Sequence, residues 1–226
     1  MLVRNWMSKN VESIGPDDNM LDAVNRMRDR KVHMLPVLDG EKIVGVVTDR
    51  DIKRSSASDA STLEIHELMY LISKIKVRDI MSKKVVTVPD DYTVEETAEV
   101  LLQSRISGVP VVDNAGKLVG VITQTDIFRV LISITGVEKR GIQFAFLLED
   151  TPGSIKAVAD VMRTYGGRIA SILTSYEEAP EGGRKVFIRM YGLDRFKLEE
   201  LKNELKEKFH LLYMVDNREE KREIYE

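Results

Sequence analysis

The sequence predicts an α+β protein in which a tandem repeat precedes a third unit of different pattern. Met7-Ser8-Lys9 recurs at Met81-Ser82-Lys83, and Val44-Gly45-Val46 recurs at Val119-Gly120-Val121. From about residue 140 the pattern changes to longer strands that alternate with two amphipathic helices. A repeat of about 55 residues cannot easily bury a stable core alone, so we expect the two copies to pack on each other and to form paired clefts.

Each repeat, 1–57 and 76–133, predicts the order strand, helix, strand, strand, helix. Asn19 is placed to cap a first helix, and Thr93 with Glu96 has the spacing of a capping box in the second copy. The β-branched runs 35–38 and 43–47, and their counterparts 109–112 and 118–122, flank short turn sequences and predict hairpins. Between the repeats, residues 58–75 predict a linker helix, because Ser61 and Glu64 form a further capping box before apolar residues at helical spacing.

Residues 140–216 predict the order βαββαβ, which is that of a ferredoxin-like unit. We expect strands at 143–148, 168–175, 184–191 and 211–215. Thr151 and Pro152 predict the N-cap and first residue of one helix, and Asp194 predicts the cap of the other. The charge-mixed residues 217–226 predict a solvated tail.

Composition narrows the functional classes. The 226 residues carry a net charge of −3 with both signs interspersed and contain no cysteine, which disfavours nucleic-acid binding and excludes thiolate metal sites. His33, His66 and His210 lie in separate segments without metal-ligand spacing, and no catalytic motif is present. With no signal peptide and no membrane-spanning run, the sequence predicts a cytoplasmic, non-enzymatic protein without metal or membrane contact.

The repeated turn Thr-x-x-Asp, at Thr48 to Asp51 and Thr123 to Asp126, is the strongest functional signal. In each copy a strand ends and a helix begins, so backbone N–H groups and the positive end of the helix dipole are available to a phosphate. The aspartate offers two acceptor oxygens, which suit the vicinal hydroxyls of a ribose. The alternative is that both threonines are ordinary N-caps and both aspartates merely favour the first helical turn.

These motifs, together with Leu35-Pro36-Val37 and Val109-Pro110-Val111, resemble the CBS domain, here as the tandem pair called a Bateman module. The resemblance covers residues 1 to about 133. It implies a regulatory protein that requires no cofactor and binds AMP, ADP, ATP or S-adenosylmethionine in clefts between the repeats.

The resemblance also implies which residues form the two clefts. Ribose and phosphate contacts come from the Thr-x-x-Asp turn of one repeat and adenine contacts from the other, with His33 at a position near ligand phosphate in some members. One cleft would combine Thr123, Thr125 and Asp126 with Met7, Glu12, Val32 and His33. The other would combine Thr48, Arg50 and Asp51 with Met81, Val86, Ile106 and Ser107.

The third unit resembles an ACT domain through Glu149-Asp150-Thr151-Pro152-Gly153 and the βαββαβ order. This implies a possible site for an amino acid or other small metabolite near Asp150 and Gly153, although several amino-acid-binding members carry asparagine where this chain has Asp150. A unit used only for pairing is the alternative.

The whole arrangement is similar to bacterial acetoin-utilisation protein B and its relatives. We therefore expect a homodimeric sensor that acts on an unidentified protein target. The alternatives are an unliganded assembly scaffold in acetoin or related carbon metabolism and, disfavoured by the missing catalytic groups, an enzyme acting on acetoin or nucleotides.

Overall fold

A computed structural model describes residues 1–57 and 72–225 and divides the chain into two compact units, Met1–Phe128 and Arg129–Glu226. Each unit is described by itself below. The predicted capping box Ser61–Glu64 and most of the predicted linker helix lie outside the described residues, whereas residues 72–74 are helical.

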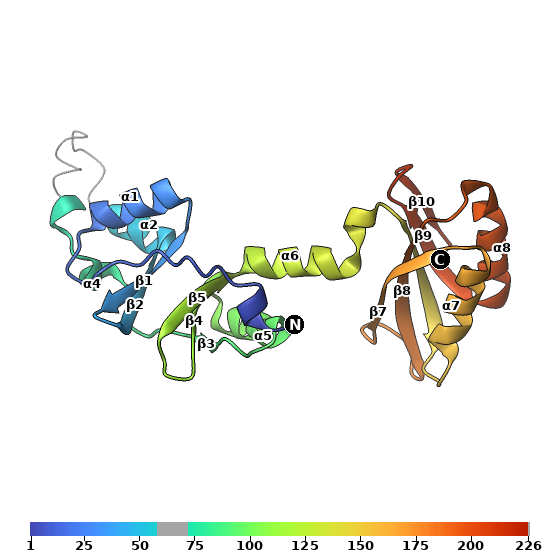
Figure 1. Ribbon diagram of the computed structural model, residues 1–226, viewed down its shortest axis with the longest axis horizontal. Helices are drawn as coiled ribbons and strands as arrows, with labels where there is room; N and C mark the ends of the chain where they lie inside the picture. The colour runs from blue at the N-terminus through green and yellow to red at the C-terminus, as the bar shows by residue number, and fades with distance from the viewer. Residues whose placement is uncertain (58–71, 226) are drawn as a thin grey trace. The chain divides into compact units, whose positions relative to one another are not determined.

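The first unit contains the two repeats, each built around an antiparallel hairpin with helices packed beside it (Figure 1). In the first repeat the elements are η1 (Val3–Asn5), α1 (Met20–Arg30), β1 (Met34–Asp39), β2 (Lys42–Thr48) and α2 (Asp49–Ala57). In the second they are α4 (Val77–Ile80), β3 (Val88–Pro89), α5 (Val94–Ser104), β4 (Gly108–Val112), β5 (Leu118–Thr123) and α6 (Gln124–Thr135), whose last residues belong to the second unit.

Both predicted helix starts are confirmed. Asn19 accepts a hydrogen bond from the Asp22 amide and forms a capping box at the start of α1. Thr93 and Glu96 form the same reciprocal arrangement at the start of α5. Each helix satisfies in this way two amide groups that would otherwise lack partners.

The sequence predicts a strand at the start of each repeat, which is wrong for the first repeat and holds for only two residues in the second. The first repeat has only an isolated bridge between Ile14 and Val37, and the second has the two-residue strand β3. The segments that precede them pair across the repeats instead, since Ser8 bridges to Val121 and Ser82 bridges to Val46. Each repeat therefore contributes its N-terminal segment to the hairpin of the other.

The repeated glycines explain why this exchange is possible. A Cβ atom at Gly45 would overlap the Met81 side chain, and one at Gly120 would overlap the Met7 side chain. A methionine from one repeat therefore lies directly on the backbone of the second hairpin strand of the other. The repetition of Met-Ser-Lys and of Val-Gly-Val in the sequence reflects this reciprocal packing.

The second unit has the predicted βαββαβ order. After η2 (Val137–Lys139) its elements are β6 (Ile142–Glu149), α7 (Ser154–Thr164), β7 (Arg168–Ser175), β8 (Gly183–Tyr191), η3 (Arg195–Lys197), α8 (Leu198–Lys208), β9 (His210–Asp216) and β10 (Lys221–Ile224). The sheet order is β10-β9-β6-β8-β7, and every pairing is antiparallel. Helices α7 and α8 cover one face of this sheet (Figure 1), over a core that includes Phe144, Phe146 and Met162.

Three local predictions for this unit need correction. The cap of α7 is Gly153, at φ +94° and without a side-chain hydrogen bond, rather than Thr151, so the helix begins at Ser154 instead of Pro152. Asp194 caps the short 3-10 helix η3 before α8 begins. Within the predicted solvated tail, residues 221–224 form β10, which pairs with β9.

Candidate functional site

A cavity of about 270 Å³ in the first unit is lined by both repeats. The first repeat supplies the end of β2 and the start of α2, and the second supplies the segment 82–86 and the residues that lead into β4. The lining residues are Met34, Val46, Thr48, Asp49, Arg50, Asp51, Arg54, Ser82, Lys84, Val85, Val86, Arg105, Ile106, Ser107, Gly108 and Pro110.

The Thr48 to Asp51 turn forms a reciprocal cap on one wall of this cavity. One Asp51 carboxylate oxygen accepts hydrogen bonds from the Thr48 amide at 3.0 Å and from its hydroxyl at 2.7 Å. The other oxygen accepts from the Arg54 guanidinium at 2.8 Å. Because a carboxylate has about four lone-pair sites, these three bonds leave Asp51 one acceptor site for a ligand.

Cationic side chains outnumber carboxylates around the cavity. Four lining residues are basic and two, Asp49 and Asp51, are acidic; the basic ones are Arg50, Arg54, Lys84 and Arg105. A concave surface with excess positive charge attracts anions. The cavity therefore combines polar groups suited to a ribose with charge suited to a phosphate.

The structure brings together six of the seven residues predicted for this cleft. Thr48, Arg50, Asp51, Val86, Ile106 and Ser107 all line the cavity. Met81 is the exception, since it is not among the lining residues and packs on Gly45 instead.

Sequence reasoning missed three of the four cations, Arg54, Lys84 and Arg105. Arg105 follows α5 in the left-handed conformation at φ +56°, and Lys31 follows α1 in the same conformation at φ +54°. Basic residues in matched positions after the first helix of each repeat were the signal available in the sequence.

The second Thr-x-x-Asp turn has the same local geometry. Asp126, which is 6% exposed, accepts hydrogen bonds from the Thr123 amide at 2.9 Å and from its hydroxyl at 2.7 Å. Thr125, by contrast, is exposed on the first turn of α6.

The residues predicted to join that turn in the second cleft, Met7, Glu12, Val32 and His33, each have a different environment. Met7 packs on Gly120, at the strand that leads to Thr123, and Val32 is half-buried. Glu12 forms an ion pair with Arg30 at 3.1 Å. The His33 side chain is 86% exposed, and its Nδ1 lies 3.9 Å from a carboxylate oxygen of Asp49, which lines the other cleft.

In the second unit, the predicted ligand residues lie after the end of β6. Asp150 forms an ion pair with Arg184 at 3.2 Å, and the same guanidinium donates a hydrogen bond to the Ser154 hydroxyl. A Cβ atom at Gly153 would meet only open space. Asp150 is thus already engaged, whereas the backbone at Gly153 is accessible.

Two structural observations concern metal binding and membrane crossing. Within residues 1–57 and 72–225 no three His, Cys, Asp or Glu side chains are grouped to hold a metal ion. Over the same residues no helix has the length and apolar character that a bilayer crossing requires.

Comparison with known proteins places the first unit in a family. The CBS domain model matches residues 3–58 and 77–133, and the chain belongs to the CBS domain family. A CBS domain-containing protein of Dictyostelium discoideum is 30% identical over 135 residues, which make up 59% of this chain and 93% of the relative. The tandem pair predicted from the sequence is confirmed.

An inosine-5′-monophosphate dehydrogenase of Methanocaldococcus jannaschii is 35% identical over 122 residues. The match covers 54% of this chain but spans only 22% of the dehydrogenase. The similarity is therefore to a minor part of that enzyme.

Solved structures show the same fold for the repeats. The CBS pair of protein MJ0100, crystallised in complex with 5′-methylthioadenosine and S-adenosyl-L-methionine, is 28% identical with a TM-score of 0.50, and the match covers 58% of this chain and 95% of that one. The CBS-pair protein CBSX2 of Arabidopsis thaliana is 30% identical with a TM-score of 0.51, over 60% and 96% of the two chains. The family match ends at residue 133, before β6 begins, so the ACT and acetoin-utilisation resemblances stay predictions.

Proposed function

We propose that this protein is a regulatory sensor that binds an adenosine-type ligand in the cleft between its CBS repeats. The observation that carries the proposal is the cavity beside the Thr48 to Asp51 turn, where residues of both repeats meet. The complex of the similar MJ0100 pair with two adenosyl compounds supports this ligand class.

In this proposal each wall of the cavity contacts a different part of the ligand. The ribose lies beside Asp51, which lines the cavity together with Thr48 and keeps one acceptor site. The adenine packs against Val86 and Ile106, the apolar residues supplied by the second repeat. The cations Arg50, Lys84 and Arg105 select among ligands by the phosphate, or other charged substituent, at the 5′ position.

Calorimetric titration with AMP, ADP, ATP and S-adenosylmethionine tests the proposal directly. We expect saturable binding of at least one of them, and an increase in thermal stability with the same compound, because a ligand that binds the native state raises it. If none of the four binds or stabilises the protein, the scaffold alternative is correct and the clefts have lost their ligands.

We further propose that the second unit is an ACT-type regulatory domain with a small-molecule site beside Gly153. The βαββαβ order, the sheet order and the open space at Gly153 support this assignment. A titration with the twenty amino acids, followed through the amide signals of residues 150–154, tests it. Signals that respond to none of them would restrict the unit to pairing.

We also propose that the protein is a homodimer. Helix α6 carries an exposed apolar stripe at i, i+3 and i+4, formed by Phe128, Leu131 and Ile132, which are 60%, 51% and 44% exposed. A second copy of the chain would bury this stripe. Light scattering should give the mass of a dimer, and Leu131→Glu should shift the protein toward monomer, whereas Phe196→Glu, at a residue 96% exposed on η3, should not. A wild-type monomer would contradict the proposal.

A further inference from the structure

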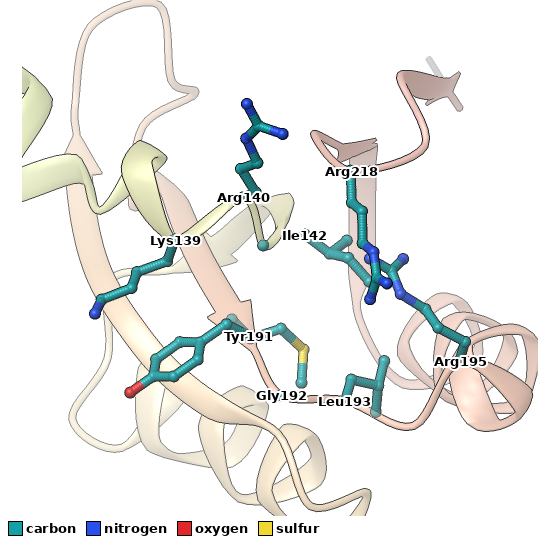
Figure 2. A pocket seen from close by; sticks show the side chains of 10 residues that line it. Lys139, Arg140, Ile142, Tyr191, Gly192, Leu193, Arg195 and Arg218 are labelled. Atoms are coloured by element: carbon teal, nitrogen blue, oxygen red, sulfur yellow. The ribbon is translucent and has the colours of Figure 1, made fainter.

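A second cavity, of about 380 Å³, lies within the C-terminal unit, at the end of the sheet where β6 begins and β8 ends (Figure 2). Four segments line it: the turn before β6, the end of β8, the 3-10 helix η3 and the turn between β9 and β10. Asp150 and Gly153 follow the opposite end of β6. The cavity is therefore separate from the ACT-type site proposed above, and it belongs to a different unit from the CBS cleft.

The charged residues that line this cavity are all basic. They are Lys139, Arg140, Arg195 and Arg218. Arg195 forms a two-pronged ion pair with Asp216, which is 1% exposed, and lies 4.0 Å from Glu219. In the part of the chain that the structure describes, no carboxylate lies within 4.0 Å of the guanidinium groups of Arg140 or Arg218. Even with Asp216 and Glu219 counted, four cations meet two carboxylates.

Asp216 holds two sides of the cavity in place. Besides Arg195, its carboxylate accepts hydrogen bonds from the backbone amides of Arg218 at 2.9 Å and Glu219 at 3.3 Å. Burial raises the pKa of Asp216, but the hydrogen bonds from Arg195 and the two amides outweigh it and hold the pKa below its usual value. The carboxylate stays charged, so it keeps Arg195 and the turn that carries Arg218 fixed before any ligand arrives.

The positions of the guanidinium groups indicate where an anion would bind. In Figure 2 the side chains of Arg195 and Arg218 extend from different elements toward the same part of the cavity. Lys139 lies on another side, with its ammonium group 5.8 Å from the centre of the Tyr191 ring. Guanidinium groups pair with phosphate oxygens through two parallel hydrogen bonds, and groups fixed in advance lose little entropy on binding.

The remaining lining is apolar. Ile142 and Met190 are 2% and 0% exposed and form the floor, while Tyr191 and Leu193 are half-buried at the sides. An apolar floor beside a cluster of cations fits a ligand that has an anionic group joined to an uncharged part. The volume is within the range of about 300–1,000 Å³ that is usual for small-molecule sites.

We propose that this cavity binds a small phosphate-bearing metabolite, with the phosphate held by Arg195 and Arg218 and the uncharged part on Ile142 and Met190. A phosphate carries a charge of about −1.5 to −2 and three acceptor oxygens, so it satisfies several guanidinium groups at once. A carboxylate carries one charge and two oxygens and would leave part of the cluster without a partner. The site would give this unit a ligand of its own, in addition to the adenosyl ligand of the CBS cleft.

The test is a titration of the full-length, ¹⁵N-labelled protein with inorganic phosphate and with phenyl phosphate, at constant ionic strength. We expect saturable shifts of the amide signals at 139–142, 190–193, 195 and 218. Phenyl phosphate should bind several-fold more tightly than phosphate, because its ring reaches the apolar floor. Benzoate, which carries a carboxylate on the same ring, tests whether the site prefers phosphate. If benzoate binds as tightly as phenyl phosphate, the phosphate assignment is overturned.

Three variants locate the binding. Arg218→Gln should weaken phenyl phosphate binding at least tenfold, and it leaves the Arg195–Asp216 pair intact. Arg222→Gln, at an exposed arginine of β10 outside the cavity, should bind as the wild type does. Arg50→Gln/Lys84→Gln, in the CBS cleft, should also leave these shifts unchanged. Equal responses in the Arg218 variant and the wild type, or shifts confined to the first unit, would overturn the proposal.

Discussion

At the residue scale, the aspartate of each Thr-x-x-Asp turn caps a helix and is also proposed to bind a ribose. The sequence presented ribose binding and helix capping as alternatives, and the structure shows the capping role at both Asp51 and Asp126. The two roles are compatible for Asp51, because three hydrogen bonds leave one acceptor site on its carboxylate. Sequence spacing could not reveal this, since the partners of a carboxylate depend on its rotamer and on a second residue, here Arg54.

The first prediction concerns Asp51. Asp51→Ala removes an acceptor from the proposed ribose site, and hydrogen bonds to charged groups contribute about 1.5–3 kcal/mol, so adenosyl-ligand affinity should fall roughly ten- to a hundredfold. Glu96→Ala is the matched control, because it breaks the capping box of α5, whose residues Thr93 and Glu96 do not line the cavity. Calorimetry on both variants separates ribose binding from helix stability. Equal affinities in the two would show that Asp51 only caps α2.

The second prediction concerns the cations. Lys84 lines the described cleft and His33 was predicted at the other, so each should favour a phosphorylated ligand over its nucleoside. We expect Lys84→Ala to weaken AMP binding by about fivefold, as for an exposed charge pair worth near 1 kcal/mol, and to leave adenosine binding unchanged. His33→Ala should show the same selectivity. Equal losses for AMP and adenosine would assign either residue to the packing of the cleft.

At the level of elements, the sequence predicted best where periodicity and capping agreed. The hairpins β1–β2 and β4–β5 and the helices α1 and α5 appear where the sequence places them, because side-chain period and cap residues select the same structure. The predicted start of α7 was wrong because Gly153, in the left-handed conformation, separates the N-cap sequence Thr151-Pro152 from the helix. Strand β10 was missed because Lys221, Arg222 and Glu223 look like a solvated run until β9 supplies the pairing edge.

The third prediction follows from how β10 is held. Hydrogen bonds from Lys221 and Tyr225 lower the pKa of Glu223 from its ordinary 4.5 to about 2. Because the folded-state pKa is depressed, the stabilisation is complete above about pH 4.5 and is lost as the pH falls toward 2. Amide signals of residues 221–224 should therefore report fraying of β10 between pH 4.5 and 2, ahead of those of β6.

A variant tests the same contact at neutral pH. Glu223→Gln should release β10 at pH 7 and speed amide exchange at residues 221–224. Glu207→Gln, at an exposed glutamate of α8, is the control and should leave β10 unchanged. If β10 is as protected in Glu223→Gln as in the wild type, pairing with β9 alone holds the strand.

At the scale of the whole molecule, the sequence predicted two different parts, with the second repeat ending near residue 133. The CBS family match ends at the same residue, whereas the division into compact units falls after Phe128, inside helix α6. The difference arises because the carbonyl of Thr135, the last residue of α6, accepts hydrogen bonds from the Ser171 hydroxyl at 2.8 Å and the Arg189 guanidinium at 2.9 Å. Such contacts between residues distant in the chain leave no trace in local periodicity.

The last prediction is that ligand binding in the first unit alters the stability of the second, because α6 contributes to both. Its first turn carries Asp126, and its last residue is bound by Ser171 and Arg189. A ligand at a hundred times its dissociation constant stabilises the state that binds it by about 2.7 kcal/mol. If the units are coupled, native-state amide exchange of β7 and β8 should slow when the adenosyl ligand found by calorimetry is added.

A flexible insertion supplies the control for this coupling. Gly136 follows α6 at φ +64°, and a Gly/Ser segment placed after it keeps all the residues of both units but lengthens the connection. The inserted protein should bind the ligand with unchanged affinity in the first unit and should lose the effect on β7 and β8. Coupling between sites is reciprocal, so phenyl phosphate bound to the second unit should change adenosyl-ligand affinity only in the uninserted protein. A shared helix transmits a change only when its two ends respond together. If the ligand leaves the amide exchange rates of β7 and β8 in the wild type unchanged, the two units respond independently.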